Sequence, residues 1–382
     1  MTFRIQRAAT GEEVVLTISG DIADGHESDL RALLDAERAR TVVLDLAGLT
    51  VVDRDGVLVL AGSEARGAML TNCPGYVREW IDRERQEDRM TTVRESAARE
   101  ETFTASGGLK LSYRSWRPAG SPRAVVVIVP GFNSHSGYYE WAAGQFTGAG
   151  VAVYALDLRG RGKSDGERFF VAQFDDYLSD VDGMITLAGS HEPALPVFLF
   201  GHSAGGVVAC LYALDHQSRL AGLISESFAF QTPAPDFALA VLKGLGHVFP
   251  HAHVLRLKNE DFSRDPKVVA EMNADPLIAG EAQPTKTVAA MVRADERLEN
   301  EFQLITLPLL ILHGTADKAT RPEGSRLFHD RAGSLDKTLK LYEGHVHDLL
   351  RDLDRELVMA DIVPWIASRI GKARPGSQSP AF

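Results

Sequence analysis

The strongest chemical signal in this chain is a serine in a tight turn. Ser203 is the centre of Gly201–Gly205, which matches Gly-x-Ser-x-Gly; an apolar run, Val197–Phe200, precedes the turn, and residues with helical spacing, Val207–Leu214, follow it. A strand–turn–helix context predicts a nucleophile elbow with a strained serine backbone. The residues two positions away must be small, because the strand and helix backbones nearly touch there. The pattern therefore predicts a nucleophilic serine at a helix N-terminus.

Two later segments supply partners for this serine. Asp317 follows an apolar run at 309–312, and the segment after the run at 338–341 carries His345 and His347. A carboxylate can orient an imidazole, which then takes the proton of the serine as general base. Either histidine can be drawn as the base. We expect His347, because it lies where a leucine-rich helix is expected to begin near Asp348. We expect His345 to lie inside the turn, pointing to solvent or to the loop backbone.

Backbone N–H groups near the serine complete the expected site. The loop Pro130–Gly137 follows the apolar run Ala124–Val129. Its N–H at Phe132, together with that of Ala204, is expected to form the oxyanion hole, where one donor contributes about 10²–10³ in rate. Expected substrate contacts are made by three side chains, His135, Phe228 and Phe230.

Four segments together resemble the monoacylglycerol lipase/lysophospholipase group of serine hydrolases. They are residues 201–206, 135–139 and 157–166, and the spacing Gly344-x-x-His347. The resemblance covers nearly all of residues 102–370. It implies an α/β-hydrolase fold, the chain order Ser203, Asp317, His347, an acyl-serine intermediate, no cofactor, and an acyl ester of glycerol or of a lysophospholipid as substrate. One departure is Pro130–Gly131, where the group usually has His-Gly; proline lacks an N–H, but the donor at Phe132 remains.

Two kinds of alternative function remain. One kind uses Ser203, Asp317 and His347 for another reaction, and the other uses no catalytic residues. A broader esterase, a thioesterase, a peptidase or an acyltransferase would need the same three residues. A ligand-sensing signalling module, in which the hydrolase fold binds a small molecule without turnover, is the alternative from a different class. Rapid ester hydrolysis with a burst distinguishes the enzyme from the receptor.

Strands alternating with helices predict a mostly parallel sheet over residues 102–373. The expected strands are 102–104, 109–116, 124–129, 151–156, 197–200, 222–225, 309–312 and 338–341. Residues from about 230 to 304 break this rhythm and predict an inserted helical cap with apolar residues that can contact a lipid surface transiently. A last helix is expected over 348–370, interrupted or kinked at Pro364. Residues 374–382 are expected to be a disordered tail.

The first 85 residues predict a separate small α/β domain. Expected elements are strands at 3–5, 14–18, 41–46 and 68–71 and helices at 28–38, 55–66 and 76–85. This order, with residues 19–21 and 44–56, resembles the STAS domain of anti-sigma-factor antagonists. The resemblance implies a phosphoacceptor hydroxyl where this chain has Arg54 and Asp55, so the usual switch is not expected. The domain is expected to bind a protein partner or to self-associate, and 86–101 is expected to be a charged linker.

The totals limit the function classes. The chain has 382 residues, a net charge of −11 and two cysteines, Cys73 and Cys210. The negative charge argues against nucleic acid and against an anionic membrane surface as electrostatic partners. No apolar run is long enough to span a membrane, and the few cysteines fit a reducing compartment, so a cytoplasmic protein is expected. No metal is expected at the histidines of the cap, His247, His251 and His253, because no further ligands stand at suitable spacing.

Overall fold

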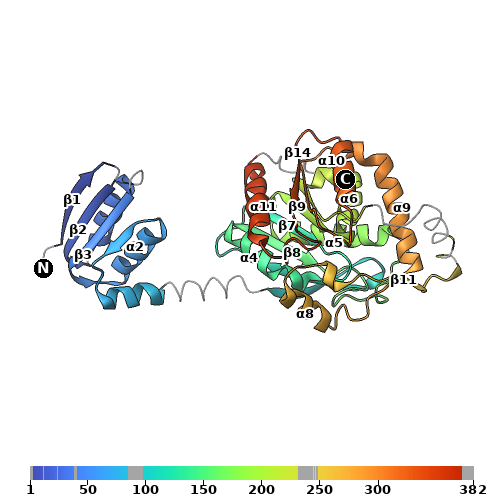
Figure 1. Cartoon of the computed structure of the whole chain (residues 1–382), viewed down its shortest axis with the longest axis horizontal. Helices are drawn as coiled ribbons and strands as arrows, with labels where there is room; N and C mark the ends of the chain where they lie inside the picture. Colours follow the sequence, from blue (N-terminus) through green and yellow to red (C-terminus); the bar gives the residue numbers. More distant parts are fainter. Residues whose placement is uncertain are drawn as a thin grey trace. The chain divides into compact units, whose positions relative to one another are not determined.

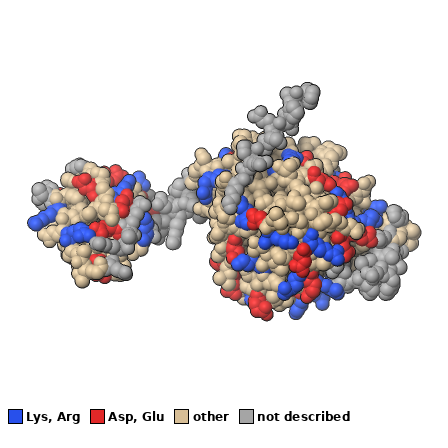
Figure 2. All heavy atoms as spheres, turned by 90° about the horizontal axis from the view of Figure 1, so that it is seen from above, with Lys and Arg blue, Asp and Glu red and all other residues tan. Residues whose placement is uncertain are grey.

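The computed structural model describes residues 3–84 (except 12, 24 and 38–40), 98–230 and 244–371 (except 245 and 247). The chain divides into two compact units, Met1–Glu95 and Ser96–Phe382 (Figure 1). Most of the expected linker and the expected tail lie outside the described residues. Positive and negative side chains are interspersed on the visible surface of each unit (Figure 2).

The N-terminal unit is a four-stranded sheet with helices. Its strands lie in the order β1-β2-β3-β4, with β1 antiparallel to β2 and the other pairs parallel. All the expected elements are present, and the first strands are longer than expected. The elements are β1 (Arg4–Thr10), β2 (Glu13–Ile22), α1 (His26–Ala36), β3 (Thr41–Val52), α2 (Arg54–Ala65), β4 (Met69–Thr71) and a helix over 75–84. Alternate residues of β2 (Val14, Leu16, Ile18) enter a core of their own.

The second unit contains an eight-stranded sheet in the order β14-β13-β10-β9-β7-β8-β6-β5. Six strands are parallel, while β6 is antiparallel to β8 and β5 to β6. This arrangement confirms the predicted α/β fold, and β5 and β14 form the two edges. The strands are β5 (Arg99–Thr104), β6 (Lys110–Trp116), β7 (Ala124–Val129), β8 (Val151–Leu156), β9 (Val197–His202), β10 (Gly222–Glu226), β13 (Leu309–Gly314) and β14 (Lys337–Tyr342).

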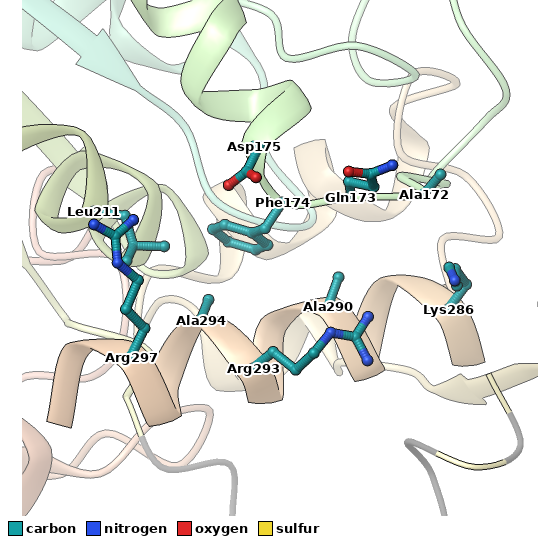
Figure 3. Close-up of a pocket in the computed structure, with 10 residues that line it drawn as sticks. All are labelled: Ala172, Gln173, Phe174, Asp175, Leu211, Lys286, Ala290, Arg293, Ala294 and Arg297. Atoms are coloured by element: carbon teal, nitrogen blue, oxygen red, sulfur yellow. The ribbon is translucent and has the colours of Figure 1, made fainter. Parts of the chain in front are cut away.

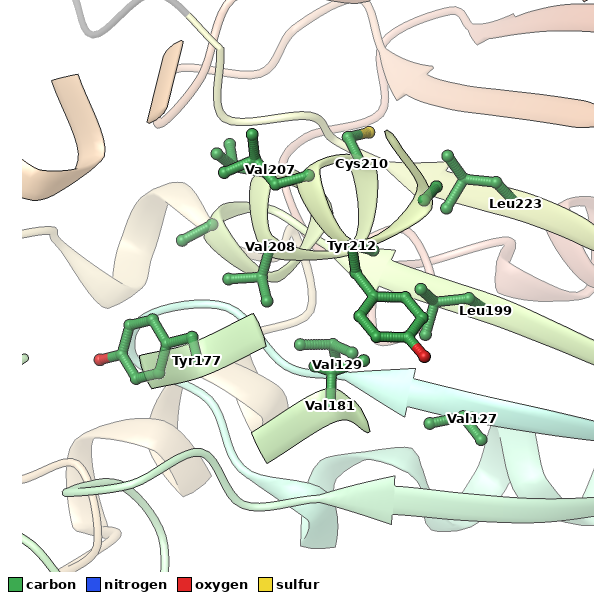
Figure 4. Close-up of a cluster of buried hydrophobic side chains, with 14 of the residues drawn as sticks. Val127, Val129, Tyr177, Val181, Leu199, Val207, Val208, Cys210, Tyr212 and Leu223 are labelled. Atoms are coloured by element: carbon green, nitrogen blue, oxygen red, sulfur yellow. The ribbon is translucent and has the colours of Figure 1, made fainter. Parts of the chain in front are cut away.

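Helices cover both faces of this sheet. The main ones are α4 (Glu140–Gly148), α5 (Asp175–His191), α6 (Ala204–His216), α10 (Pro322–Arg331) and α11 (Arg355–Ile370). All six residues of β7 are buried, as expected for a parallel strand inside a sheet. Figure 4 shows Val127 and Val129 of β7 on the face covered by Val208 and Tyr212 of α6. The alternate residues of β7 enter the second core, which α4 and α11 cover.

The inserted cap is not wholly helical, so this part of the prediction is wrong. Two helices, α8 (Pro266–Ala274) and α9 (Thr285–Glu301), accompany a two-stranded antiparallel sheet of β11 (His253–Leu255) and β12 (Gln283–Pro284). Residues 231–243, 245 and 247 lie outside the described part. Short 3₁₀ turns connect elements of the second unit: η1 (Ser106–Gly108), η2 (Ser136–Tyr139), η3 (Gln217–Arg219), η4 (Asn259–Asp261) and η5 (Phe302–Leu304).

The last helix begins later than expected. Residues 348–354 form turns, and α11 starts at Arg355 after Asp354, whose φ of 60° lies in the left-handed region. A residue in that conformation cannot continue a helix, so the segment after His347 is a loop. Pro364 lies inside α11 and does not end it. The sequence analysis also omitted α10, which precedes β14.

Candidate active site

Ser203 occupies the sharp turn between β9 and α6. Its φ of 56° and ψ of −121° place it outside the ordinary regions for a residue with a side chain. The Ser203 N–H donates to the Glu226 carbonyl oxygen at 2.9 Å, which fixes the turn against β10. A Cβ at Gly201 would lie 2.5 Å from the carbonyl oxygen of Gly205, and one at Gly205 would collide with the backbone of Val129. The expected need for small residues at both positions is confirmed.

His347 connects Ser203 to Asp317. Its Nε2 lies 2.9 Å from the Ser203 Oγ, and its Nδ1 lies 2.8 Å from Asp317 Oδ2. The side chains of His347 and Asp317 are fully buried. Asp317 comes from the loop after β13, and His347 from the loop after β14. The structure thus brings together the three residues that the sequence analysis selected, in the geometry of a nucleophile, a base and an orienting carboxylate.

The Asp317 carboxylate has a second imidazole partner. His313 Nε2 lies 3.0 Å from Asp317 Oδ2, and the Thr320 hydroxyl donates to the same oxygen at 2.7 Å. Burial alone would raise the pKa of Asp317, but the two histidines outweigh it and hold the pKa well below its ordinary range. Asp317 is therefore ionised whenever His347 must accept a proton. The sequence analysis gave His313 no role, although its position four residues before Asp317 was a signal.

His345 differs from its expected position. It is only 5% exposed, and its Nδ1 lies 3.9 Å from Asp352 Oδ2, so of the two expected orientations the one towards solvent is wrong. Burial and the charge of Arg264 lower the pKa of His345. The ring of His345 is buried because residues 348–354 form a loop in place of the expected helix, and Asp352 of this loop lies beside the ring. His345 makes no contact with Ser203.

The two expected oxyanion donors lie beside the nucleophile. Phe132 and Ala204 line the same cavity as Ser203. In the described part of the chain neither N–H donates to a protein acceptor, so both are available to a substrate oxygen. A Cβ at Gly131 would lie 2.8 Å from the Ser203 Cβ, so only glycine allows the loop to lie this close to the elbow. Asn133, two residues further on, has a φ of 50°, in the left-handed region.

A buried arginine packs behind the oxyanion loop. The Arg161 guanidinium lies 4.1 Å from the centre of the Phe132 ring and is ion-paired with Glu281 of the cap. Its Nη2 donates to Gln283 Oε1 at 2.7 Å. Arg161 is 2% exposed. The sequence analysis included Arg161 only within a motif of the resemblance, because its partners lie 120 residues away.

The cavity at Ser203 has a volume of about 350 Å³. Of the three expected substrate contacts, Phe230 lines it, and His135 and Phe228 do not. His135 Nε2 instead lies 2.8 Å from Asp275 Oδ2, and Phe228 packs in an aromatic cluster. The lining is mostly apolar and comes from the elbow, the cap and the Asp317 loop: Phe132, Ser203, Ala204, Ala229, Phe230, Val254, Leu255, Arg256, Leu257, Lys258, Asp261, Val288, Met291, Lys318, Ala319 and Thr320.

A second cavity of about 450 Å³ lies between α9 and the start of α5 (Figure 3). Lys286, Arg293 and Arg297 of α9 line it, and no residue of the Ser203 group does. Arg297 is ion-paired with Asp215 at 2.6 Å. No helix among the described residues is long and apolar enough to cross a membrane.

Three buried ionisable side chains form a cluster near His347. Polar atoms of His202, Glu226 and Asp348 lie within 4.8 Å of one another, and the His202 ring centre is 5.0 Å from that of His347. Burial and the neighbouring Asp348 raise the pKa of Glu226 well above its ordinary value. Burial lowers the pKa of His202 well below its ordinary value, which favours the neutral imidazole. Sequence reasoning gave no role to Glu226 or Asp348.

Comparisons with known proteins agree with this geometry. A family model described as "Serine aminopeptidase, S33" matches residues 120–354. A monoacylglycerol lipase of Mycolicibacterium smegmatis is 32% identical over 72% of this chain and 99% of its own length. The human monoglyceride lipase is 34% identical over 72% of this chain and 91% of its own length. The crystal structure of the Paleococcus ferrophilus monoacylglycerol lipase, 32% identical, covers 68% of this chain and 99% of its own with a TM-score of 0.62. The chain therefore belongs to this serine aminopeptidase S33 (Hydrolase_4) family of α/β-hydrolases.

Proposed function

We propose that this protein is a serine ester hydrolase that cleaves monoacylglycerols through an acyl-serine intermediate. The observation that carries the proposal is the position of His347. Its ring lies within hydrogen-bond distance of both the Ser203 Oγ and the Asp317 carboxylate. The relatives named as monoacylglycerol and monoglyceride lipases support this class of ester.

The proposed reaction has two halves. In the first, the Ser203 Oγ attacks the ester carbon while His347 takes its proton, and the N–H groups of Phe132 and Ala204 stabilise the oxyanion. The intermediate collapses, His347 gives the proton to the departing glycerol oxygen, and an acyl-serine remains. In the second half, His347 takes a proton from water, the hydroxide attacks the acyl carbon, and the fatty acid leaves as the proton returns to Ser203. Asp317 stays ionised and stabilises the imidazolium.

The acyl chain is assigned to the apolar part of the cavity. Phe230, Leu257, Val288 and Met291 line it together with Ser203. Each methylene group that leaves water contributes about 0.8 kcal/mol to binding. A chain-length series is therefore expected to raise kcat/KM until the cavity is full, which distinguishes a lipase from an esterase of short acids.

The test combines covalent labelling with turnover. A fluorophosphonate probe is expected to label Ser203, and the purified protein is expected to release fatty acid from monoacylglycerol. Ser203→Ala should abolish both, whereas Asp317→Asn should lower kcat by about 10⁴. Labelling of another serine in Ser203→Ala, or full turnover in Asp317→Asn, would contradict the assignment.

We further propose that the N-terminal unit is a STAS-like binding domain. The order of its strands and helices supports this. At the start of α2, Asp53 accepts a hydrogen bond from the Gly56 N–H at 2.8 Å, and Arg54 pairs with Glu84 at 3.0 Å. Neither Arg54 nor Asp55 carries a hydroxyl, so an anti-sigma-type kinase is expected not to phosphorylate this site. The proposed role is contact with a protein partner or a second copy, tested by sedimentation of the unit and of the full chain.

Two further proposals concern location and surface. A cytoplasmic location is proposed from the cysteines, since Cys73 and Cys210 are both free. Transient contact of the cap with lipid is proposed from Val248 and Phe249, which are 67% and 60% exposed. Flotation of the protein with neutral vesicles tests this contact.

A further inference from the structure

The cavity at Ser203 has a cationic edge. Arg256, Lys258 and Lys318 are exposed side chains that line the same cavity as the nucleophile. Two of them follow β11 in the cap, and Lys318 directly follows Asp317, whose carboxylate contacts His347. The edge is therefore built by two segments of the chain, the cap and the loop that carries Asp317, beside a mostly apolar interior.

These cations have no protein partner in the described part of the chain, where no ion pair or side-chain hydrogen bond joins them to another residue. Some other cations of this unit are paired, such as Arg264 with Asp352 at 2.7 Å and Arg297 with Asp215 at 2.6 Å. One carboxylate, Asp261, also lines the cavity. Three positive side chains and one negative side chain give this edge a local positive charge, whereas the net charge of the whole chain is −11.

A neutral headgroup makes little use of such an edge. The glycerol of a monoacylglycerol offers hydroxyl groups, which water satisfies equally well. A phosphate monoester offers about two negative charges and several acceptor oxygens, which a guanidinium binds through paired hydrogen bonds and an ammonium binds as a point charge. The edge lies at the cavity that holds Ser203, so a phosphate on the departing alcohol would be within its reach while the acyl chain fills the apolar part.

We propose that the cavity selects single-chain acyl esters whose headgroup carries an anionic phosphate, such as acylglycerol phosphates, over neutral monoacylglycerols of equal chain length. This inference rests on the ester hydrolysis proposed above and specifies its substrate class. The hydrolysis itself is unchanged: the acyl–oxygen bond breaks, and the phosphate group leaves with the alcohol.

The test measures kcat/KM on three decanoyl esters below their aggregation concentrations: monoacylglycerol, acylglycerol phosphate, and the zwitterionic choline lysophospholipid. The wild-type protein is expected to prefer the acylglycerol phosphate to the monoacylglycerol by about tenfold, less at high salt, since each exposed cation contributes a factor of about two to five. The zwitterion is expected to fall between them. Replacing Arg256, Lys258 and Lys318 together by glutamine should remove this preference.

Lys267→Gln is the matched control, because Lys267 is an exposed cation of the cap that does not line the cavity. It should keep the wild-type preference. Circular dichroism and thermal unfolding check that each variant is folded. If the wild type cleaves all three esters and the triple variant keeps the same ratio, the inference is overturned and the ester hydrolase stands. If the wild type cleaves none of them, the proposed function fails as well.

Discussion

The Arg161 guanidinium stacks on the ring of Phe132, 4.1 Å from its centre. Phe132 lines the cavity at Ser203 and is a proposed oxyanion donor, and Arg161 is bound by Glu281 and Gln283 of the cap. One buried side chain therefore joins the cap to the loop that is proposed to stabilise the oxyanion. Movement of Glu281 would be transmitted to Phe132 through rigid, packed groups.

Arg161→Met is expected to lower kcat by about ten- to a hundredfold with a smaller change in KM, because a displaced donor weakens binding of the oxyanion and not of the ground state. Arg159→Met is the matched control. Arg159 lies in the same loop and pairs with buried Asp180 at 2.5 Å, but it does not contact Phe132. Each variant should lose about 3–5 kcal/mol of unfolding free energy. Equal kcat losses per folded molecule in the two variants would contradict a specific role for the contact between Arg161 and Phe132.

The two histidines after β14 are expected to respond differently to alanine. His347→Ala should lower kcat by about 10⁶, as removal of the base does in comparable triads. His345→Ala should lower kcat by tenfold or less and should act mainly on stability, since its ring is buried beside Asp352. Steady-state kinetics and urea unfolding of both variants separate the two effects. A larger kcat loss in His345→Ala would reverse the assignment of the base.

Glu226 is expected to make stability depend on pH. Its pKa is raised in the folded protein, first by burial and then by Asp348, from an ordinary value of 4.5. The folded state therefore holds a proton that the unfolded state has released, so the free energy of unfolding falls as the pH rises above about 4.5 towards the folded pKa. Glu226→Gln removes this dependence. Its stability relative to wild type, measured by urea unfolding between pH 4.5 and 8, should increase with pH; a constant difference would contradict the shift.

The second unit is expected to fold and hydrolyse esters without the first. Its cores contain no residue of the N-terminal unit. β5 begins at Arg99, before the boundary expected at 102, so the chain should start at Ser96. A chain starting at Ala105 lacks β5 and exposes the edge of β6, and it should be less soluble. Esterase activity and thermal unfolding of the two truncated chains test whether the second unit folds and works alone. Insolubility of the chain that starts at Ser96 would show that the units share a core.

The sheet and the selected triad were predictable because their signals are local. Residues 124–129 are apolar throughout, which marks a strand buried on both faces. Ser203, Asp317 and His347 come soon after the strands expected at 197–200, 309–312 and 338–341, and the carboxyl ends of parallel strands meet at one edge of the sheet. The glycines on both sides of Ser203 also indicated that strand and helix approach closely there, and this pattern spans only a few consecutive residues.

The remaining features depend on contacts between distant segments. Arg161 meets Glu281 across 120 residues, and no local pattern marks either as a partner. The cap was expected to be helical from its composition, but the short strands β11 and β12 pair over only a few residues and leave no periodic pattern. The start of α11 was misplaced because the segment after His347 is rich in leucine, whereas tertiary contacts bury Leu349 and Leu350 in the core.

The two edges of the eight-stranded sheet are both charged. β5 begins Arg99-Glu100-Glu101, and β14 carries Lys337 and Lys340. Free strand edges invite pairing with the same edge of another molecule, and charged side chains oppose the alignment that such pairing needs. The catalytic unit is thus protected against growth of its sheet into aggregates at both ends, and concentrated preparations of this enzyme should remain free of strand-mediated aggregation.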